Sequence, residues 1–165
     1  MAIDARTAAT LWWTHDEAAI PDSIQFVREK HQGDGAVVAA TFRNSSGRLR
    51  RGMVGLRRFD DSGWRMAGGG WSSGLRDVPD DAIWSDVGGW GSVTPPRGVR
   101  GGWVNEPAAR RISVTDPNGR TEEDTIESGV AILIWEGNFD DSRATVELLD
   151  EHGHVIRTGP MRAQR

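Results

Sequence analysis

The chain has 165 residues, of which 37% are hydrophobic, and it carries a net charge of −4 and no cysteine. This length suits one domain or two small β units that share a core, and the apolar content is too high for a disordered chain. The lack of cysteine excludes disulfides, thiol catalysis and thiolate metal sites. The acidic balance argues against non-specific binding to nucleic acid, which requires a basic surface.

Charge is distributed unevenly along the chain. Residues 1–75 hold ten basic and eight acidic side chains, whereas residues 76–165 hold ten and sixteen. No apolar run approaches the ~20 residues of a membrane-spanning helix, and residues 1–10 lack the apolar core of a secretory signal. As the sequence stands, we expect a soluble, cytoplasmic protein with no membrane partner; a targeting segment removed beforehand would leave no trace in it.

One helix is predicted over about residues 5–18. Asp4 is a suitable N-cap, the segment is rich in alanine, and Pro21 closes it. The residues expected on one helical face are Ala5, Ala8, Trp12 and Ala19. No second convincing helix follows.

A β pattern extends from about residue 24 to residue 68. Three turns rich in Asn, Asp and Gly, at residues 33–35, 44–47 and 60–63, divide it into four strands. The long third strand ends near Phe59. The first half is therefore predicted to be a helix followed by a four-stranded antiparallel meander.

This order of elements resembles cystatin-like and nuclear transport factor 2-like folds over about residues 4–70. The sequence Asp61-Ser62-Gly63-Trp64-Arg65 looks like the final hairpin of such domains. The resemblance implies that the helix lies in the curve of the meander. These folds host both enzymes and binding modules, so it implies no particular function.

Residues 76–109 are dominated by Gly, Pro and Trp. Gly-Gly-Trp occurs three times in the chain, once before this segment at residues 69–71 and twice within it at residues 88–90 and 101–103. The prolines argue against long central strands, so short irregular strands folded over the sheets are expected. The copies are unevenly spaced and do not define a structural repeat.

From residue 110 the β pattern returns, with five expected strands. Asp116-Pro117-Asn118-Gly119 is a strong turn, and residues 130–135 are apolar on both faces, as in a strand buried on both sides. The predicted fold is thus mainly β, at the margin of α+β. Its parts are a helix plus meander (residues 1–75), a Gly/Pro/Trp-rich bridge (76–109) and a sandwich-like antiparallel unit (110–165), together in one compact globule.

The sequence Gly70-Trp71-Ser72-Ser73-Gly74 matches the G-x-S-x-G motif of serine hydrolases. That motif requires a turn from a strand into a helix, and the residues from Leu75 to Pro79 read as a loop. No βαβ pattern surrounds it either. The match is therefore interpreted as a chance one.

His152 and His154 form an H-x-H pair, which on a strand would point both rings to one face, as in a metal site. No third ligand is defined by spacing, and His152 lies in a turn. The acidic residues around Asp116 do not fit the EF-hand pattern for calcium, because the glycine comes at the wrong position. We therefore expect neither a metal site nor a cofactor.

The candidate binding residues are tryptophans and arginines. Exposed indole rings stack on sugars or bases and anchor protein interfaces, although inter-sheet packing is the favoured reading of the bridge tryptophans. Trp12, Trp13, Trp64 and Trp135 lie in regular elements and are expected in the core. The residues proposed for binding are Trp71, Trp84, Trp90, Trp103, Arg48 and Arg50.

Arg48 and Arg50 belong to a concentration of positive charge on neighbouring strands, with Arg51, Arg57 and Arg58. It could bind an anion or an acidic partner, be a solvated outer sheet face, or meet the acidic second half of the same chain.

The leading hypothesis is a non-catalytic binding domain whose contact surface lies at the bridge. Its partner would be a protein or a small ligand, and a homo-oligomer is an open alternative. The runner-up is a small enzyme with a pocket in the curve of the meander, using residues such as His15, His31 or Asp34. A third hypothesis is a carrier of a small apolar ligand.

Overall fold

The computed structural model describes residues 2–59, 62–74, 84–93 and 96–161, and describes their side chains outside residues 67–96. The chain divides into two compact units, unit 1 (Met1–Arg76) and unit 2 (Asp77–Arg165). One N-terminal helix and antiparallel sheets make up the fold, which confirms the predicted mainly β class. In the described part of the chain, no helix has the length and apolar character needed to cross a membrane.

Unit 1 begins with helix α1 (Ala5–Asp16). Its N-cap is Asp4, as predicted, and the Asp4 carboxylate accepts a hydrogen bond from the backbone N–H of Thr7. Of the predicted face, Ala5 and Ala19 are buried, whereas Ala8 and Trp12 are only partly buried at the core margin and Ala9 and Trp13 take the fully buried positions. Spacing alone does not distinguish the pair Ala8 and Trp12 from the pair Ala9 and Trp13, because the members of each pair are four residues apart. Packing of the helix on the sheet decides which pair is buried.

The sheet of unit 1 is a meander with the strand order β1-β2-β3-β4. The four strands are β1 (Gln25–Gln32), β2 (Gly35–Arg43), β3 (Leu49–Phe59) and β4 (Gly63–Gly74). Every pair of neighbours is antiparallel, and glycines with positive φ (Gly33, Gly47 and Gly63) stand at the turns that the sequence predicted.

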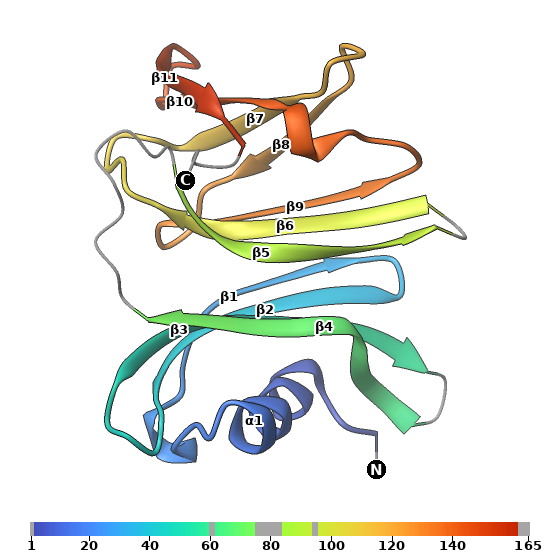
Figure 1. Cartoon of the computed structure of the whole chain (residues 1–165), viewed down its shortest axis with the longest axis vertical. Coiled ribbons are helices and arrows are strands. Elements are labelled where there is room, and N and C mark those ends of the chain that lie inside the picture. The colour runs from blue at the N-terminus through green and yellow to red at the C-terminus, as the bar shows by residue number, and fades with distance from the viewer. Residues whose placement is uncertain (1, 60–61, 75–83, 94–95, 162–165) are drawn as a thin grey trace. The chain divides into compact units, whose positions relative to one another are not determined.

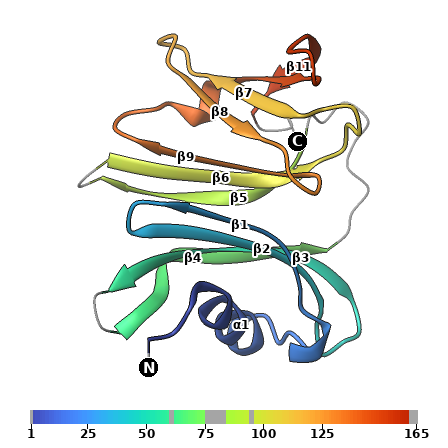
Figure 2. The ribbon, with the colours of Figure 1, turned by 180° about the vertical axis from the view of Figure 1, so that it is seen from behind.

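Helix α1 lies against one face of this sheet in both views of the chain (Figures 1 and 2). The apolar residues between them form the core of unit 1. Its larger members are Trp13, Val38, Phe42, Val54 and Leu56. Because α1 covers this face, any polar side chain that points toward the helix is either at the margin of the core or paired.

Unit 2 contains two sheets. The strands of the first, in the order β11-β10-β7-β8, are β7 (Arg111–Thr115), β8 (Thr121–Thr125), β10 (Thr145–Leu149) and β11 (Val155–Pro160). Those of the second, in the order β5-β6-β9, are β5 (Trp84–Val93), β6 (Pro96–Val104) and β9 (Val130–Glu136). The five strands predicted after residue 110 are all present.

The predicted bridge supplies β5 and β6, which are long strands rather than the short irregular ones expected. The central strand of its sheet is β6, and it begins at Pro96. Proline is tolerated at the first residue of a strand, where no ladder hydrogen bond is lost. The prolines therefore limit where β6 begins and do not prevent a long central strand.

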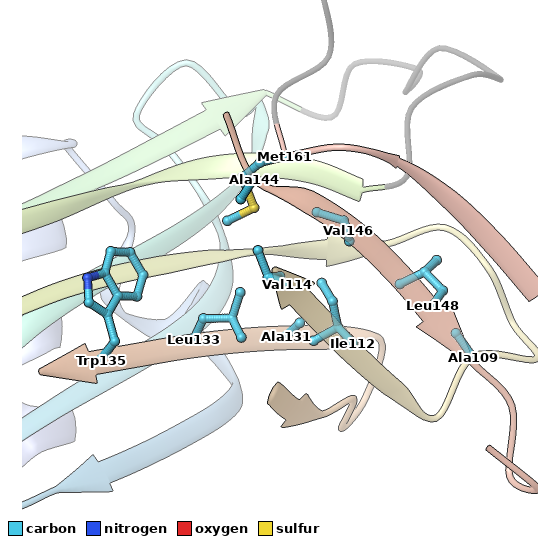
Figure 3. Packing of buried hydrophobic residues seen from close by; sticks show 10 residues of the cluster. All are labelled: Ala109, Ile112, Val114, Ala131, Leu133, Trp135, Ala144, Val146, Leu148 and Met161. Carbon is cyan, nitrogen blue, oxygen red and sulfur yellow. The ribbon is translucent and has the colours of Figure 1, made fainter. Parts of the chain in front are cut away.

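The core of unit 2 lies between its two sheets. Side chains from β7, β9 and β10 converge there, together with Ala109, Ala144 and Met161 from outside these strands, as Figure 3 shows. The members include Ile112, Leu133, Trp135, Val146 and Leu148. Asp124 of β8 adds a polar link, since its Oδ2 accepts a hydrogen bond of 2.6 Å from the backbone N–H of Ile132 in β9.

Asp116 organises the turn between β7 and β8. It is 5% exposed and its carboxylate accepts hydrogen bonds from the backbone N–H groups of Asn118 and Arg120, at 2.8 and 2.9 Å, and of Asp140. Burial alone would raise the pKa of Asp116, but these bonds outweigh burial and hold the pKa below its ordinary value of 3.8. The predicted turn is thus stabilised by an ionised carboxylate.

We expect Asp116→Ala to lower the urea midpoint of unfolding at pH 7, because three backbone donors lose their acceptor. Asp150→Ala is the matched comparison, since Asp150 accepts from two backbone N–H groups in a similar turn but is 23% exposed. The urea midpoint is expected to fall further in the Asp116→Ala variant than in the Asp150→Ala variant. A folded-state pKa below 3.8 makes this stabilisation present above pH 3.8 and lost as pH falls through the lowered pKa. A difference from wild type that stays constant down to pH 2 would contradict this role.

Candidate functional site

A bulge in β1 turns polar side chains toward α1. The pairing of β1 with β2 shifts by one residue at Val27, after which Glu29 and His31 lie opposite Val38 and Ala36. Both partners belong to the core beneath α1. Opposed side chains of an antiparallel pair point to the same face, so Glu29 and His31 lie on the helix side of the sheet.

The Glu29 carboxylate holds two basic side chains at once. Its Oε2 accepts a hydrogen bond of 2.8 Å from Nε of Arg6, in the first turn of α1. Its Oε1 lies 2.6 Å from Nε2 of His31. The Glu29 side chain is 22% exposed, whereas those of Arg6 and His31 are 57% and 48% exposed. The carboxylate is therefore shielded, and its two partners extend into solvent.

The charge state of Glu29 determines which nitrogen of His31 carries the proton. Burial would raise the pKa of Glu29, but the hydrogen bonds and charges of His31 and Arg6 outweigh burial and hold the pKa below 4.5. An ionised carboxylate only accepts hydrogen bonds, so Nε2 of His31 is the donor. In neutral His31 the other ring nitrogen, Nδ1, is then an acceptor, and in protonated His31 it becomes a second donor.

Two aromatic rings complete the arrangement. The ring of Trp64 meets that of His31 edge-on, with centroids 5.1 Å apart and an interplanar angle of 77°. The guanidinium of Arg6 lies 5.1 Å from the ring centroid of Phe26, within reach of a cation–π interaction. We call these residues the Glu29 cluster: Arg6, Phe26, Glu29, His31 and Trp64.

Trp64 reaches this cluster because of how β4 begins. It lies opposite Arg58, two residues after the core residue Leu56, so it points to the helix side and packs against the core margin. Its backbone N–H donates to the carbonyl of Ile3 at 2.9 Å. The preceding Gly63 has φ +81° and lies so close to Ile3 that a Cβ would be 2.4 Å from its backbone atoms. Glycine is thus required where β4 begins.

The residues predicted for binding lie elsewhere. Trp103 is 7% exposed, and the side chains of Trp71, Trp84 and Trp90 lie outside the described residues. Arg48 is exposed in the turn before β3, whereas Arg50 lies on the helix side and forms an ion pair of 3.5 Å with Glu17. None of the predicted residues with a described side chain is part of the Glu29 cluster.

The three residues named for a possible enzyme are not brought together. His31 belongs to the Glu29 cluster. His15 is 87% exposed beside Asp16, and Asp34 forms an ion pair of 2.6 Å with Arg57. These contacts place each of the three in a separate local arrangement.

The two catalytic or metal motifs of the sequence have structural explanations. Residues 70–74 lie within β4, where Ser72 is paired with Gly52 of β3 and not placed on a strand-to-helix turn. His152 and His154 lie beside the β10–β11 turn, 70% and 78% exposed, and Asp150 binds both backbone N–H groups. Across the described residues, no group of three or more His, Cys, Asp or Glu side chains is arranged to hold a metal ion.

Sequence reasoning missed Arg6, Phe26 and Glu29 as candidate site residues and assigned Trp64 to the core. Strict alternation along β1 would put Phe26 on the same face as Arg28 and Lys30, and Glu29 on the opposite one. The bulge at Val27 reverses this relation. The available signal was the pair of adjacent apolar residues Phe26 and Val27, which interrupts alternation.

The chain matches no protein-family model, and comparison with curated proteins and with solved structures gives no significant match.

Proposed function

We propose that this protein is a non-catalytic binding domain and that the Glu29 cluster is a contact surface of unit 1. The observation that carries the proposal is one shielded carboxylate that fixes two basic side chains, Arg6 and His31, while about half of each stays exposed. Side chains that are already held in place lose little conformational freedom when a ligand binds. The Glu29 cluster is therefore preorganised for binding a ligand.

This proposal moves the contact surface away from the bridge that the sequence favoured. Trp103 is 7% exposed and leaves little ring area for a partner. A binding role remains a prediction for Trp71, Trp84 and Trp90, whose side chains lie outside the described residues. The Glu29 cluster combines polar hydrogen-bonding groups with a partly buried aromatic ring, which is typical of ligand sites.

The test is a titration of the ¹⁵N-labelled full chain with small-molecule fragments of three classes: carboxylates, amines and neutral heteroaromatics. We expect at least one class to shift the amide signals of residues 6, 26, 29 and 31 and the indole signal of Trp64, which a Trp64→Phe variant assigns. Arg65→Gln, an exposed residue beside Trp64 on the other face of β4, is the control and should bind as wild type does. Shifts confined to other residues, or no shifts, would overturn the proposal.

The enzyme hypothesis is supported by one specific observation, the 2.6 Å contact between Glu29 and Nε2 of His31. A carboxylate in that position orients an imidazole and strengthens its other nitrogen as a general base. Turnover of a fragment or activated ester that is abolished by His31→Gln would favour the enzyme over the binding domain. Binding without turnover would favour the binding domain.

A further inference from the structure

Arg6 keeps two hydrogen-bonding groups available in the Glu29 cluster. Within the described part of the chain, its Nε is engaged by Glu29, and no hydrogen bond involves its two terminal NH₂ groups. The side chain is 57% exposed, so these groups are open to solvent. The end of a guanidinium matches the two oxygens of a carboxylate in bidentate geometry, and the hydrogen bonds are charge-assisted.

His31 adds a group whose character depends on pH. Its Nε2 is occupied by Glu29, so Nδ1 is the nitrogen left for a ligand. When His31 is protonated, Nδ1–H becomes a second donor of the Glu29 cluster, because Nε2 already donates to Glu29. The protonated cluster thus carries available donors on two side chains, Arg6 and His31.

The surrounding charges favour an anion once His31 is protonated. Arg6 and Asp4 come from α1, Glu29 comes from β1, and Arg58 of β3 lies opposite Trp64 on the same face. Asp4 is occupied by Thr7 as the helix N-cap. With neutral His31 the charges of these groups cancel, and with protonated His31 their sum is positive.

The geometry points to a ligand in which a carboxylate is carried next to a flat apolar group. In this inference, which rests on the proposed function, Arg6 and His31 bind the carboxylate and Trp64 contacts the apolar group. Trp64 is partly buried against the core and its ring is fixed edge-on to His31, so it forms a rigid apolar wall beside the donors. The same chemistry occurs in small aromatic acids and at the carboxyl terminus of a peptide that ends in an aromatic residue.

Indole-3-acetate and its neutral analogue indole-3-acetamide are the first pair of probes, with the full chain in calorimetric and NMR titrations at pH 6. We expect the acid to bind roughly tenfold more tightly than the amide at pH 6. A peptide ending in Phe, with a free or an amidated carboxyl terminus, forms the second pair. If indole-3-acetate binds more tightly than the peptide with a free carboxyl terminus, the ligand is a small aromatic acid. If that peptide binds more tightly, the ligand is a peptide carboxyl terminus.

Arg6→Gln is expected to abolish the preference for the acid and His31→Gln to reduce it, while Arg65→Gln retains it. Circular dichroism of each variant would verify folding. Equal binding of acid and amide at the Glu29 cluster would overturn this inference and leave the proposed function intact. Equal effects of Arg6→Gln and Arg65→Gln would also overturn it. Signals that shift only outside the cluster would overturn both the inference and the proposed function.

Discussion

Trp13→Ala is expected to lower the free energy of unfolding of unit 1 by about 3–5 kcal/mol. Trp13 is fully buried, and its ring lies with its centroid 5.7 Å from that of Phe42 and 6.3 Å from that of Phe26. It also packs on the backbone of Gly52, where an added Cβ would be 2.8 Å from Nε1 of the indole. Removing this ring leaves a cavity between α1 and the sheet that small neighbouring alanines cannot fill.

Trp13→Phe is the matched variant. The indole Nε1 is buried and has no hydrogen-bond partner among the described residues. Phenylalanine removes that donor and keeps most of the aromatic contact, and we expect a loss of only about 1 kcal/mol.

Urea unfolding monitored by hydrogen exchange in α1 and β2 reports on unit 1 without interference from the other tryptophans. Equal losses for Trp13→Ala and Trp13→Phe would contradict the attribution of the effect to lost aromatic packing. The Glu29 cluster should lose its fixed geometry together with α1, because Arg6 is supplied by the helix.

Gly98→Ala is expected to destabilise unit 2 by about 1–3 kcal/mol, as an overpacked core does. A Cβ at Gly98 would lie 2.1 Å from Cζ2 of Trp135, so the indole rests directly on the backbone of β6. Trp135 is 6% exposed, and its ring packs at a tilt of 50° against that of Phe139, with centroids 5.0 Å apart, which restricts its movement away from β6. The added methyl must displace the ring or bend the strand.

Gly35→Ala provides the control for glycine-to-alanine replacement within a strand. A Cβ there would lie 3.4 Å from the nearest atom, which is ordinary van der Waals contact, and the stability should change by less than about 0.5 kcal/mol. Hydrogen exchange under increasing urea measures the effect of Gly98→Ala on unit 2 in β6 and β9, and that of Gly35→Ala on unit 1 in β1 and β2. A loss for Gly98→Ala no larger than that for Gly35→Ala would show that Trp135 can move aside.

Local patterns predicted the first half of the chain well. Asp4 was identified as the N-cap, and the turns at residues 33–35, 44–47 and 60–63 were recognised from their Asx and Gly residues. Each of these signals acts through bonds between residues only a few positions apart, so it can be recognised in a short window of sequence.

The bridge was harder to predict because a glycine there is required by the packing of a side chain that is distant in sequence. Gly98 is required because Trp135 packs on it. Glycine and proline in an isolated segment suggest irregular structure, and pairing of β6 with β9 turns the same residues into a central strand.

The sequence by itself determined the mainly β class, the N-terminal helix, the meander and the hairpin turns, because alternation, capping and turn chemistry are local. Only the tertiary structure decided which faces are buried and where the Glu29 cluster forms. Arg6 and Glu29 are separated by 23 positions, and their contact depends on α1 lying on the sheet and on the bulge at Val27. A one-residue shift in a strand moves the following side chains to the opposite face, and that shift is decided by packing and not by any single residue type.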